Sequence, residues 1–230
     1  AGRNFVGHYS LRKWNVVPVK SPIEVQFSIA PGTAMAQRSA KARGITIVQG
    51  GDAGTAEADF ATCLVWSSRK GQELPLLMLV ANNRYGISTP YAEQHGEERI
   101  SDRGKAFGIH TATVDGNDPE VAWHALTRAI AYVRSERKPY LLEAYVSRLY
   151  GHSSASGANF VSAEVDCLEL FEQKLFERGW LRREQAQALR ERYTRELLEA
   201  SHRVREEPQP DPATLSDHVF AAPRGARSRS

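Results

Sequence analysis

Two polar residues of this 230-residue chain follow closely on short apolar runs. Asp52 stands in a Gly-Asp-Ala triplet after the apolar run 45–48, and Asn83 is the second of two asparagines after the run 76–80. A carboxylate and a side-chain amide are hard oxygen ligands, suited to a magnesium ion that also holds phosphates. The same residue types also suit two polar turns, so the pair alone leaves both interpretations open.

A second group of polar residues lies further along the chain. Arg148 and His152 belong to the segment Arg-Leu-Tyr-Gly-His-Ser, and residues 154–162 after it are rich in Ser, Gly and Ala. Such a composition is typical of a mobile loop, which favours an exposed His152 able to exchange protons. A single histidine more often has a structural role, and the residue types alone do not exclude it.

Apolar runs alternate with helical patterns through the first two thirds of the chain. We expect strands at 45–48, 76–81, 111–114 and 140–146, and helices at 59–67 and 119–134. This alternation predicts an α/β fold, a parallel sheet with helices on both faces. Ligands of such sheets bind beyond the carboxyl ends of the strands, and Asp52, Asn83, Asn117 and His152 each follow one of these runs.

Further elements are expected on either side of the sheet. Ser21 is expected to cap a helix whose first turn contains Pro22. Pro31 lies in that helical pattern and should kink or break the helix near Ala30, because proline lacks the N–H that the helix needs. After the sheet, the pattern predicts helices at 165–178 and 183–205, followed by a proline-rich linker.

The overall composition is that of an ordinary globular chain. It is 41% hydrophobic and 25% charged, with a net charge of +3, which is too small to indicate nucleic acid as a partner. No apolar run approaches the roughly 20 residues of a membrane span. Cys63 and Cys167 lack metal or redox spacing and fall in helical patterns, so we expect reduced packing residues of a cytoplasmic, bacterial-type protein.

Several motifs together resemble one family of thiamine diphosphate enzymes. Those enzymes carry Gly-Asp-Gly, a gap, then Asn-Asn, and here Ala53 replaces the second glycine. The run Asn-Asn-Arg-Tyr-Gly-Ile-Ser-Thr-Pro at 82–90 resembles the alpha subunit of the decarboxylating component of 2-oxo acid dehydrogenase complexes. The segment 148–153 resembles that subunit's histidine loop. Further matches at 2–10, 114–118, 170–180 and 215–220 extend the resemblance over nearly the whole chain.

The resemblance implies a set of site residues. Magnesium would be held by the Asp52 carboxylate, the Asn83 amide oxygen and the Tyr85 main-chain carbonyl. The family's other cofactor contacts correspond to Ser21 and Ile23 at the organic rings, Ala53 and Gly54 at the diphosphate, and Arg148 and His152 near the reacting carbon. His152 is also the implied catalytic residue. The family's second ion, potassium, is not carried over, because Val25 stands where a threonine would bind it.

The resemblance also implies an activity and partners. It implies oxidative decarboxylation of a branched-chain 2-oxo acid, with transfer of the acyl group to the lipoyl arm of an acyltransferase. The glutamate that activates the cofactor comes from a beta subunit in this family, so an α2β2 assembly is expected. The implied fold is the thiamine diphosphate-binding fold over 1–162, with part of its N-terminal region missing. A helical C-terminal extension at 163–207 and a linker and tail at 208–230 would follow.

Three other functions remain open at this stage. The same role with pyruvate as substrate fits part of the run 82–90, and a non-catalytic binding fragment fits a chain that begins without methionine. A serine hydrolase would need a Gly-x-Ser-x-Gly elbow, and the nearest match has Ala155 in place of the last glycine. No membrane partner is expected.

Overall fold

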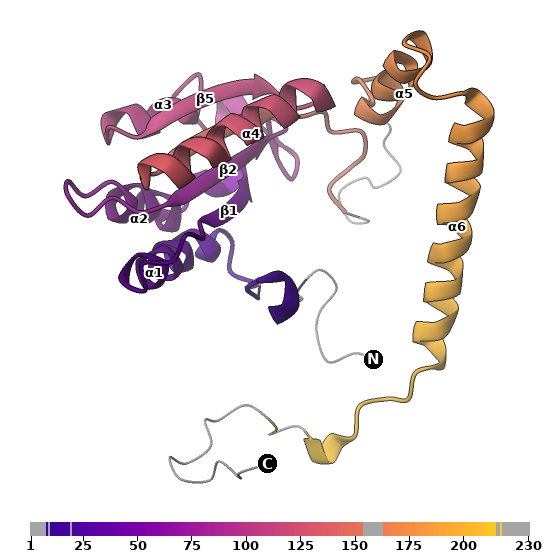
Figure 1. Cartoon of the computed structure of the whole chain (residues 1–230), viewed down its shortest axis with the longest axis horizontal. Coiled ribbons are helices and arrows are strands. Elements are labelled where there is room, and N and C mark those ends of the chain that lie inside the picture. Colours follow the sequence, from indigo (N-terminus) through magenta and orange to yellow (C-terminus); the bar gives the residue numbers. More distant parts are fainter. Residues whose placement is uncertain (1–7, 9, 19, 154–162, 215–216, 218–230) are drawn as a thin grey trace. The chain divides into compact units, whose positions relative to one another are not determined.

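The computed structural model describes residues 8, 10–18, 20–153, 163–214 and 217 (Figure 1). Its central element is a four-stranded sheet in the order β1-β2-β6-β5, with every neighbouring pair parallel. The strands are β1 (Thr46–Gly51), β2 (Leu76–Asn82), β5 (His110–Asp115) and β6 (Tyr140–Tyr145). The four predicted strands and the parallel α/β fold are therefore confirmed.

The position of each strand in the sheet follows from its apolar content. β2 and β6 are central, and their sequences Leu-Leu-Met-Leu-Val-Ala and Tyr-Leu-Leu-Glu-Ala are almost entirely apolar. β1 is an edge strand, in which Thr46 and Val48 are buried while Ile47 between them is 53% exposed. Strands covered on both faces need continuous apolar runs, whereas an edge strand can alternate.

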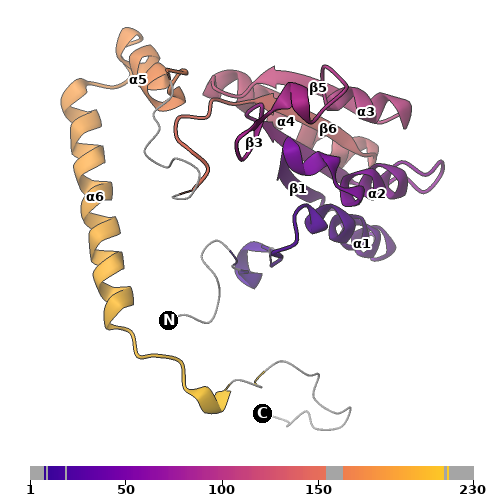
Figure 2. The same ribbon diagram turned by 180° about the vertical axis from the view of Figure 1, so that it is seen from behind.

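Helices cover both faces of the sheet, as predicted (Figure 2). Successive residues of β2 point to opposite faces, so Leu76 and Met78 join one core while Leu77 joins the other. The first core also contains side chains of α1 (Val25–Ser39) and α2 (Ala58–Ser67), and the second contains side chains of α4 (Pro119–Glu136). A short helix, α3 (Ser101–Ala106), packs against β5 and β6.

Local chemistry explains how two of these helices form and pack. Asp118 caps α4 by accepting a hydrogen bond from the Glu120 N–H at 3.0 Å, and Pro119 occupies the first turn. Phe27 of α1 and Phe60 of α2 meet edge to face, with ring centroids 5.1 Å apart. Both rings are fully buried, so this contact joins the two helices on their face of the sheet.

Two predictions about α1, the Ser21 cap and a break at Pro31, are wrong. The helix begins at Val25, four residues after Ser21, and the residue that precedes it is Glu24 with a φ of +61°. Ser21 is therefore not its cap. The helix also continues without a break from Val25 to Ser39, although Pro31 lies inside it. Ala30 and Pro31 are both buried, and we infer that their packing offsets the hydrogen bond that proline cannot make.

A small hairpin was not predicted from the sequence. β3 (Tyr85–Gly86) pairs with β4 (Thr89–Pro90). The short 3-10 helix η2 (Ala53–Ala56) contacts β3, and the 3-10 helix η3 (Tyr91–Glu93) follows β4 directly in the chain. Arg84 and Ile87 both have positive φ, with values of 64° and 58°, which lets the chain turn sharply after β2. The hairpin shapes the loop that follows Asn83.

The predicted helices after the sheet are confirmed as α5 (Cys167–Glu177) and α6 (Arg183–Glu206). Lys174 of α5 forms an ion pair with Asp118 at 2.5 Å, and Arg178 donates to Glu120, so α5 is tied to the start of α4. Cys63 is buried as expected. Cys167 is exposed, because it begins α5 on the outside, and its predicted packing role is wrong.

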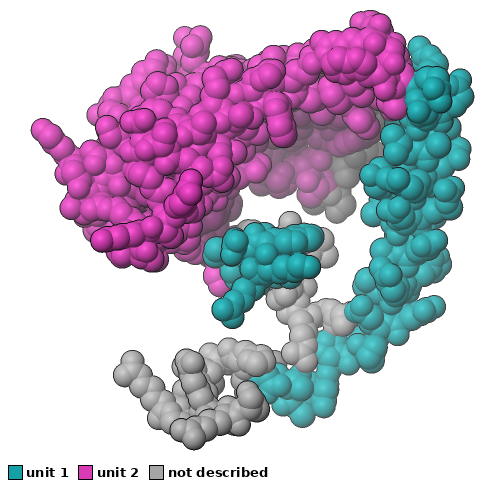
Figure 3. Space-filling view, in the orientation of Figure 1, with its two compact units in different colours: residues 1–19, 182–230 teal, residues 20–181 magenta. Residues whose placement is uncertain are grey.

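Contacts within the chain divide it into two compact units (Figure 3). Residues 20–181 form the unit that contains the sheet, and residues 1–19 with 182–230 form the other. The second unit contains α6 and the 3-10 helices η1 (Arg12–Trp14) and η5 (Pro212–Thr214). Within the described ranges, no helix is both long and apolar enough to span a membrane.

Candidate functional site

Polar residues gather at the carboxyl ends of the parallel strands. Asp52 directly follows β1, Asn83 directly follows β2, and Asn117 follows β5 by two residues. The strands end at matching levels, because Gly51 pairs with Ala81 and Asp115 pairs with Tyr145. Three of the four predicted positions therefore lie at one edge of the sheet, where such folds bind ligands.

Asp52 is the most unusual of these residues. It is only 2% exposed, and its Oδ1 accepts a long hydrogen bond of 3.4 Å from the Asn83 N–H. Its Oδ2 is buried and has no hydrogen-bond partner among the described residues. Burial raises the pKa of the Asp52 carboxyl, while nearby main-chain N–H groups lower it. A buried carboxylate oxygen without a partner is well suited to a cation.

The two asparagines point in different directions. Asn82 is buried, and its Nδ2 donates to Glu143 Oε1 at 2.7 Å while its Oδ1 accepts from the Arg84 N–H at 2.9 Å. Asn83 is partly exposed, and its Oδ1 accepts a hydrogen bond from the Tyr85 N–H at 3.0 Å. An amide oxygen has two lone pairs, so Asn83 keeps one for a further ligand.

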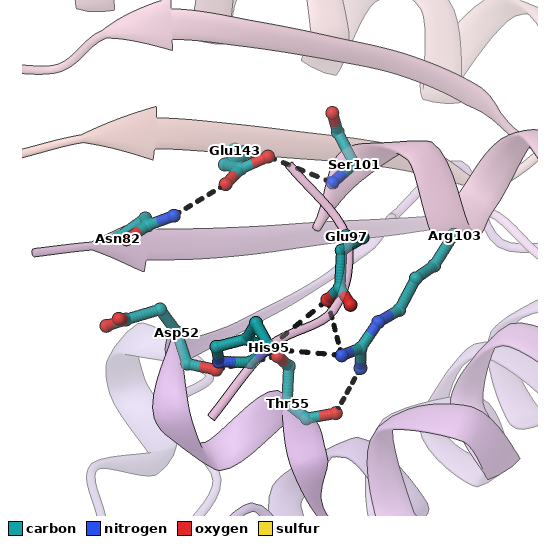
Figure 4. Close-up of polar contacts among 8 residues, drawn as sticks. All are labelled: Asp52, Thr55, Asn82, His95, Glu97, Ser101, Arg103 and Glu143. Carbon is teal, nitrogen blue, oxygen red and sulfur yellow. Dashed lines mark hydrogen bonds and ion pairs between the residues drawn. The ribbon is translucent and has the colours of Figure 1, made fainter. Parts of the chain in front are cut away.

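Glu143 is the buried carboxylate that binds Asn82 at this edge (Figure 4). It is fully buried on β6, and besides Asn82 it accepts a 2.9 Å hydrogen bond from the Ser101 N–H at the start of α3. The Thr113 hydroxyl of β5 lies 3.4 Å from its Oε2. One carboxylate on β6 thus contacts residues of β2, β5 and α3. Glu143 was not predicted from the sequence, although a glutamate inside an apolar strand was a visible signal.

A charged cluster beside Asp52 was also not predicted from the sequence (Figure 4). The Arg103 guanidinium donates to the Thr55 carbonyl and pairs with Glu97, both at 2.5 Å. The His95 side chain is fully buried, with its Nδ1 3.2 Å from Glu97 and its ring stacked on Tyr91. Because Thr55 also donates twice to the Asp52 carbonyl, the cluster holds the turn that carries Asp52.

Arg148 reaches the same loop from the end of β6. Its guanidinium lies 5.4 Å above the Tyr85 ring, donates to the Ile87 carbonyl, and donates through Nε to the Tyr150 carbonyl at 3.1 Å. A hollow of about 390 Å³ lies beside this loop. Its lining includes Asn82, Asn83, Tyr85, Asn117, Tyr145 and Glu164.

Ala53 and Gly54 form the turn after Asp52. A Cβ on Gly86 would lie 2.7 Å from the Ala53 methyl group, so the absence of a side chain at Gly86 leaves room for that methyl. A Cβ on Gly54 would lie 2.1 Å from Glu24 Oε1, so position 54 needs a glycine. The replacement of the family's second glycine by Ala53 is therefore accommodated locally.

The remaining predicted residues lie at the surface. Ser21 and Ile23 are exposed just ahead of α1, Ile23 at 66%. His152 is exposed four residues after Arg148, and the predicted mobile loop at 154–162 lies outside the described residues. Hydrogen bonds and close contacts bring together Asp52, Ala53, Gly54, Asn83, Tyr85 and Arg148, whereas Ser21, Ile23 and His152 are exposed at the surface.

The donor set fits a hard cation that is shared with phosphate oxygens. Within the described ranges, no group of three or more His, Cys, Asp or Glu residues is placed to hold a metal ion, so a metal here would depend on one carboxylate with amide and carbonyl oxygens. Asp52 Oδ2, the Asn83 amide oxygen and the Tyr85 carbonyl are such oxygens. Magnesium typically uses one or two carboxylates together with substrate phosphates and water.

The fold and its polar edge place the protein among the α/β proteins that bind ligands at the carboxyl ends of a parallel sheet. Sequence comparison then gives the family. Residues 1–213 match the family model described as "Dehydrogenase E1 component", and the chain belongs to this family. The family consists of thiamine diphosphate-dependent oxidoreductases that act on 2-oxo acids.

Curated relatives point the same way. The chain is 30% identical over 229 residues to the human mitochondrial 2-oxoisovalerate dehydrogenase subunit alpha, covering 95% of this chain and 51% of that protein. It is 30% identical over 228 residues to the Bacillus subtilis 2-oxoisovalerate dehydrogenase subunit alpha, with 96% and 68% covered. The Caenorhabditis elegans mitochondrial counterpart is 33% identical over 189 residues, with 78% and 43% covered. The chain thus spans about half the length of the animal relatives.

Proposed function

We propose that this chain is part of the alpha subunit of a decarboxylating 2-oxo acid dehydrogenase component and that it binds thiamine diphosphate through magnesium. One observation carries the proposal. Asp52 Oδ2 is buried without a hydrogen-bond partner among the described residues, next to the Asn83 loop, at the edge of the sheet where ligands bind. A bound divalent cation would satisfy that oxygen.

Each residue of the edge has a role in this proposal. Asp52, Asn83 and the Tyr85 carbonyl would hold the metal, and the backbone at Ala53 and Gly54 would approach the diphosphate. Arg148 would place its charge near the phosphates, since it already contacts Tyr85 and Ile87. Ser21 and Ile23 would border the organic rings once the surrounding assembly covers them.

The cofactor, when bound, supplies the carbon that attacks the 2-oxo acid and takes up the electrons released with carbon dioxide. The chain's own contribution is to bind, orient and exchange protons. His152 is exposed and carries an imidazole that can donate or accept a proton at either ring nitrogen. We assign it to proton transfer at the reacting carbon, which needs only hydrogen-bond reach in the assembled site.

We propose a branched-chain 2-oxo acid as substrate and a lipoyl-bearing acyltransferase as the acceptor of the acyl group. The support is that the relatives from human, Bacillus subtilis and Caenorhabditis elegans are all named 2-oxoisovalerate dehydrogenase subunits. A beta subunit would complete the site by supplying the glutamate that activates the cofactor. We propose an α2β2 assembly, as the family resemblance implies.

The metal assignment is tested by titration calorimetry of the assembled protein with thiamine diphosphate and magnesium. Asp52→Asn should abolish magnesium-dependent binding, because it removes the charge while keeping the shape. Asp115→Asn is the matched control, since Asp115 ends β5 at the same edge and its Oδ1 already accepts from the Asn117 N–H. Equal affinities of Asp52→Asn and the parent protein would contradict the assignment.

The substrate class is tested by a panel of 2-oxo acids on the full-length protein assembled with its beta subunit. The branched-chain acids should give the highest kcat/KM. A preference for pyruvate would move the protein to the pyruvate branch of the same family. No decarboxylation of any 2-oxo acid, by a protein that binds the cofactor, would favour a binding fragment without catalysis.

A further inference from the structure

Glu24 is a residue with an unusual backbone and an unusual environment. It immediately precedes α1, has a φ of +61°, and is only 6% exposed. A residue other than glycine rarely adopts a positive φ, because its Cβ then crowds the backbone. A buried glutamate in that conformation requires contacts that fix its side chain.

The contacts of the Glu24 carboxyl group are made to the end of β1. Its Oε1 accepts a hydrogen bond from the Gly51 N–H at 3.2 Å, and its Oε2 accepts one from Gln26 Nε2 at 3.1 Å. Gln26 also donates to the Gln49 carbonyl at 3.2 Å. The start of α1 is thereby joined to the last residues of β1, directly before Asp52.

Two glycines leave the space that this carboxyl group occupies. A Cβ on Gly50 would lie 2.2 Å from Glu24 Oε2, and a Cβ on Gly54 would lie 2.1 Å from Glu24 Oε1. Neither glycine has a positive φ, so what these positions require is space and not a special backbone conformation. The Glu24 side chain is seated where the side chains of residues 50 and 54 would otherwise be.

We propose that Glu24 is a positioning residue whose carboxyl group, wedged between Gly50 and Gly54 and bonded to Gly51, sets the turn that presents Asp52 to the metal and diphosphate. The wedge itself follows from these contacts alone. Its effect on the metal and diphosphate rests on the function proposed above. Asp52 lies in the middle of the turn that the wedge supports, so a shift of the turn moves the carboxylate.

The surroundings of Glu24 argue against a role in packing alone. Burial raises the pKa of Glu24 to about 7, the Gly51 hydrogen bond lowers it, and the carboxylates of Asp59 and Glu57 on or next to α2 raise it further. The side chain therefore lies in a place that disfavours its charge. An apolar side chain would fill the space without that cost, but it could not accept the hydrogen bond from Gly51.

The wedge is tested by a double-mutant cycle on the cofactor-free chain. Gly54→Ala should lower the unfolding temperature by roughly 5 °C or more, because its methyl group would overlap Glu24. In a Glu24→Ala background, Gly54→Ala should lower the unfolding temperature by at most about half as much, since the overlapping side chain is gone. An equal cost of Gly54→Ala in both backgrounds would overturn the wedge.

Gly44→Ala serves as the matched control for a glycine substitution. Gly44 lies ahead of β1, and a Cβ there would lie 3.4 Å from the end of the flexible Gln37 side chain. Gly44→Ala should change the unfolding temperature by less than about 2 °C in either background. If the change in unfolding temperature caused by Gly44→Ala differed strongly between the two backgrounds, Glu24→Ala would be altering the response to any glycine substitution. That result would also contradict the wedge.

The positioning role is tested by local amide hydrogen exchange at residues 51–55. Glu24→Ala should speed exchange at the Gly51 amide about tenfold or more, because its acceptor is removed. Glu24→Gln keeps an oxygen acceptor and nearly the same shape, so exchange should stay within about threefold of the parent protein. Unchanged exchange in Glu24→Ala would exclude any positioning of this turn.

The link to the cofactor is tested by calorimetry of the assembled protein. Glu24→Ala should weaken magnesium-dependent binding of thiamine diphosphate about tenfold, whereas Glu24→Gln should bind with nearly the affinity of the parent protein. The ranking of the three proteins by affinity should differ from their ranking by unfolding temperature. Parent-like affinity in Glu24→Ala would overturn the link. If the parent protein itself fails to bind, the proposed function fails, while the cycle and the exchange experiment still decide the wedge.

Discussion

Among single residues, the two asparagines after β2 show how neighbours of one type divide two tasks. Asn82 is buried and bound to Glu143, whereas Asn83 donates its main-chain N–H to Asp52 and accepts from the Tyr85 N–H with its amide oxygen. The sequence predicted the pair because it follows an apolar run directly. It did not predict Glu24 or Glu143 as partners, since these lie 27 residues from Gly51 and 61 residues from Asn82.

The raised pKa of Glu24 predicts a pH dependence of stability. The folded chain holds the Glu24 proton up to about pH 7, whereas the carboxyl group of the unfolded chain loses it near the ordinary glutamate pKa of 4.5. The folded state thus binds more protons between these values, so the free energy of unfolding should fall as pH rises through this window. We expect a loss of about 2 kcal/mol, after allowing for solvent screening.

Urea unfolding of the cofactor-free chain at pH 5 and pH 8 measures this effect. The amide of Glu24→Gln does not titrate. The free energy of unfolding of this variant should therefore change less between pH 5 and pH 8 than that of the parent protein, by about the 2 kcal/mol expected for Glu24. The exposed Glu136→Gln, at the end of α4, should leave the pH dependence unchanged. A parent protein and a Glu24→Gln variant with the same pH dependence would contradict the raised pKa.

Among the elements, those with long apolar patterns were predictable and the short ones were not. The four strands, α2, α4, α5 and α6 follow from runs and stripes that the sequence displays. The two-residue strands β3 and β4 and the six-residue α3 are too short for a periodic pattern. The start of α1 was predicted too early, at Ser21. The residue that directly precedes the helix is Glu24, whose positive φ the sequence does not reveal.

Glu143 should be essential to the joint between four elements. In Glu143→Gln one acceptor oxygen becomes a donor, so either the Ser101 N–H or Asn82 Nδ2 loses its buried partner. We expect the free energy of unfolding to fall by about 1–3 kcal/mol, measured by chemical denaturation. Glu136→Gln is the exposed control and should change stability by less than about 0.5 kcal/mol.

The segment after β6 gives a prediction about turnover. His152 is exposed, so His152→Ala should alter the free energy of unfolding by less than about 0.5 kcal/mol. In the assembled enzyme it should lower kcat about a hundredfold or more, as loss of a proton-transferring group does. His124→Ala, on the exposed side of α4, should change neither quantity. Parent-like kcat in His152→Ala would remove it from the catalytic group.

At the scale of the whole molecule, the site occupies one open edge of a unit that spans residues 20–181. The chain covers 51% of the human relative, and the function proposed above adds the surface of a beta subunit to the site. The sequence predicted this dependence on a partner through family resemblance only. No pattern in the residues describes a partner surface, because exposed positions carry little of the periodic signal that reveals a core.

The dependence on a partner leads to a prediction about assembly. The full-length alpha protein alone should decarboxylate 2-oxo acids at less than about 1% of the rate of the complex with its beta subunit, since the proposal places the activating glutamate on that subunit. Mixing the two subunits should raise the rate and the sedimentation coefficient together. A fully active alpha protein that sediments alone would refute the requirement.

The fit of Ala53 against Gly86 limits how this sequence can change over time. The turn after β1 and the hairpin after β2 share room for about one methyl group, because a Cβ on Gly86 would lie 2.7 Å from that of Ala53. A lineage could move the methyl from one loop to the other by passing first through glycine at both positions, provided that the end of the Gln94 side chain, 2.5 Å from a Cβ on Gly86, also moved. The opposite order, with alanine at both, passes through a steric overlap. The history of substitutions at residue 53 is therefore contingent on residue 86, although 33 positions separate them in the chain.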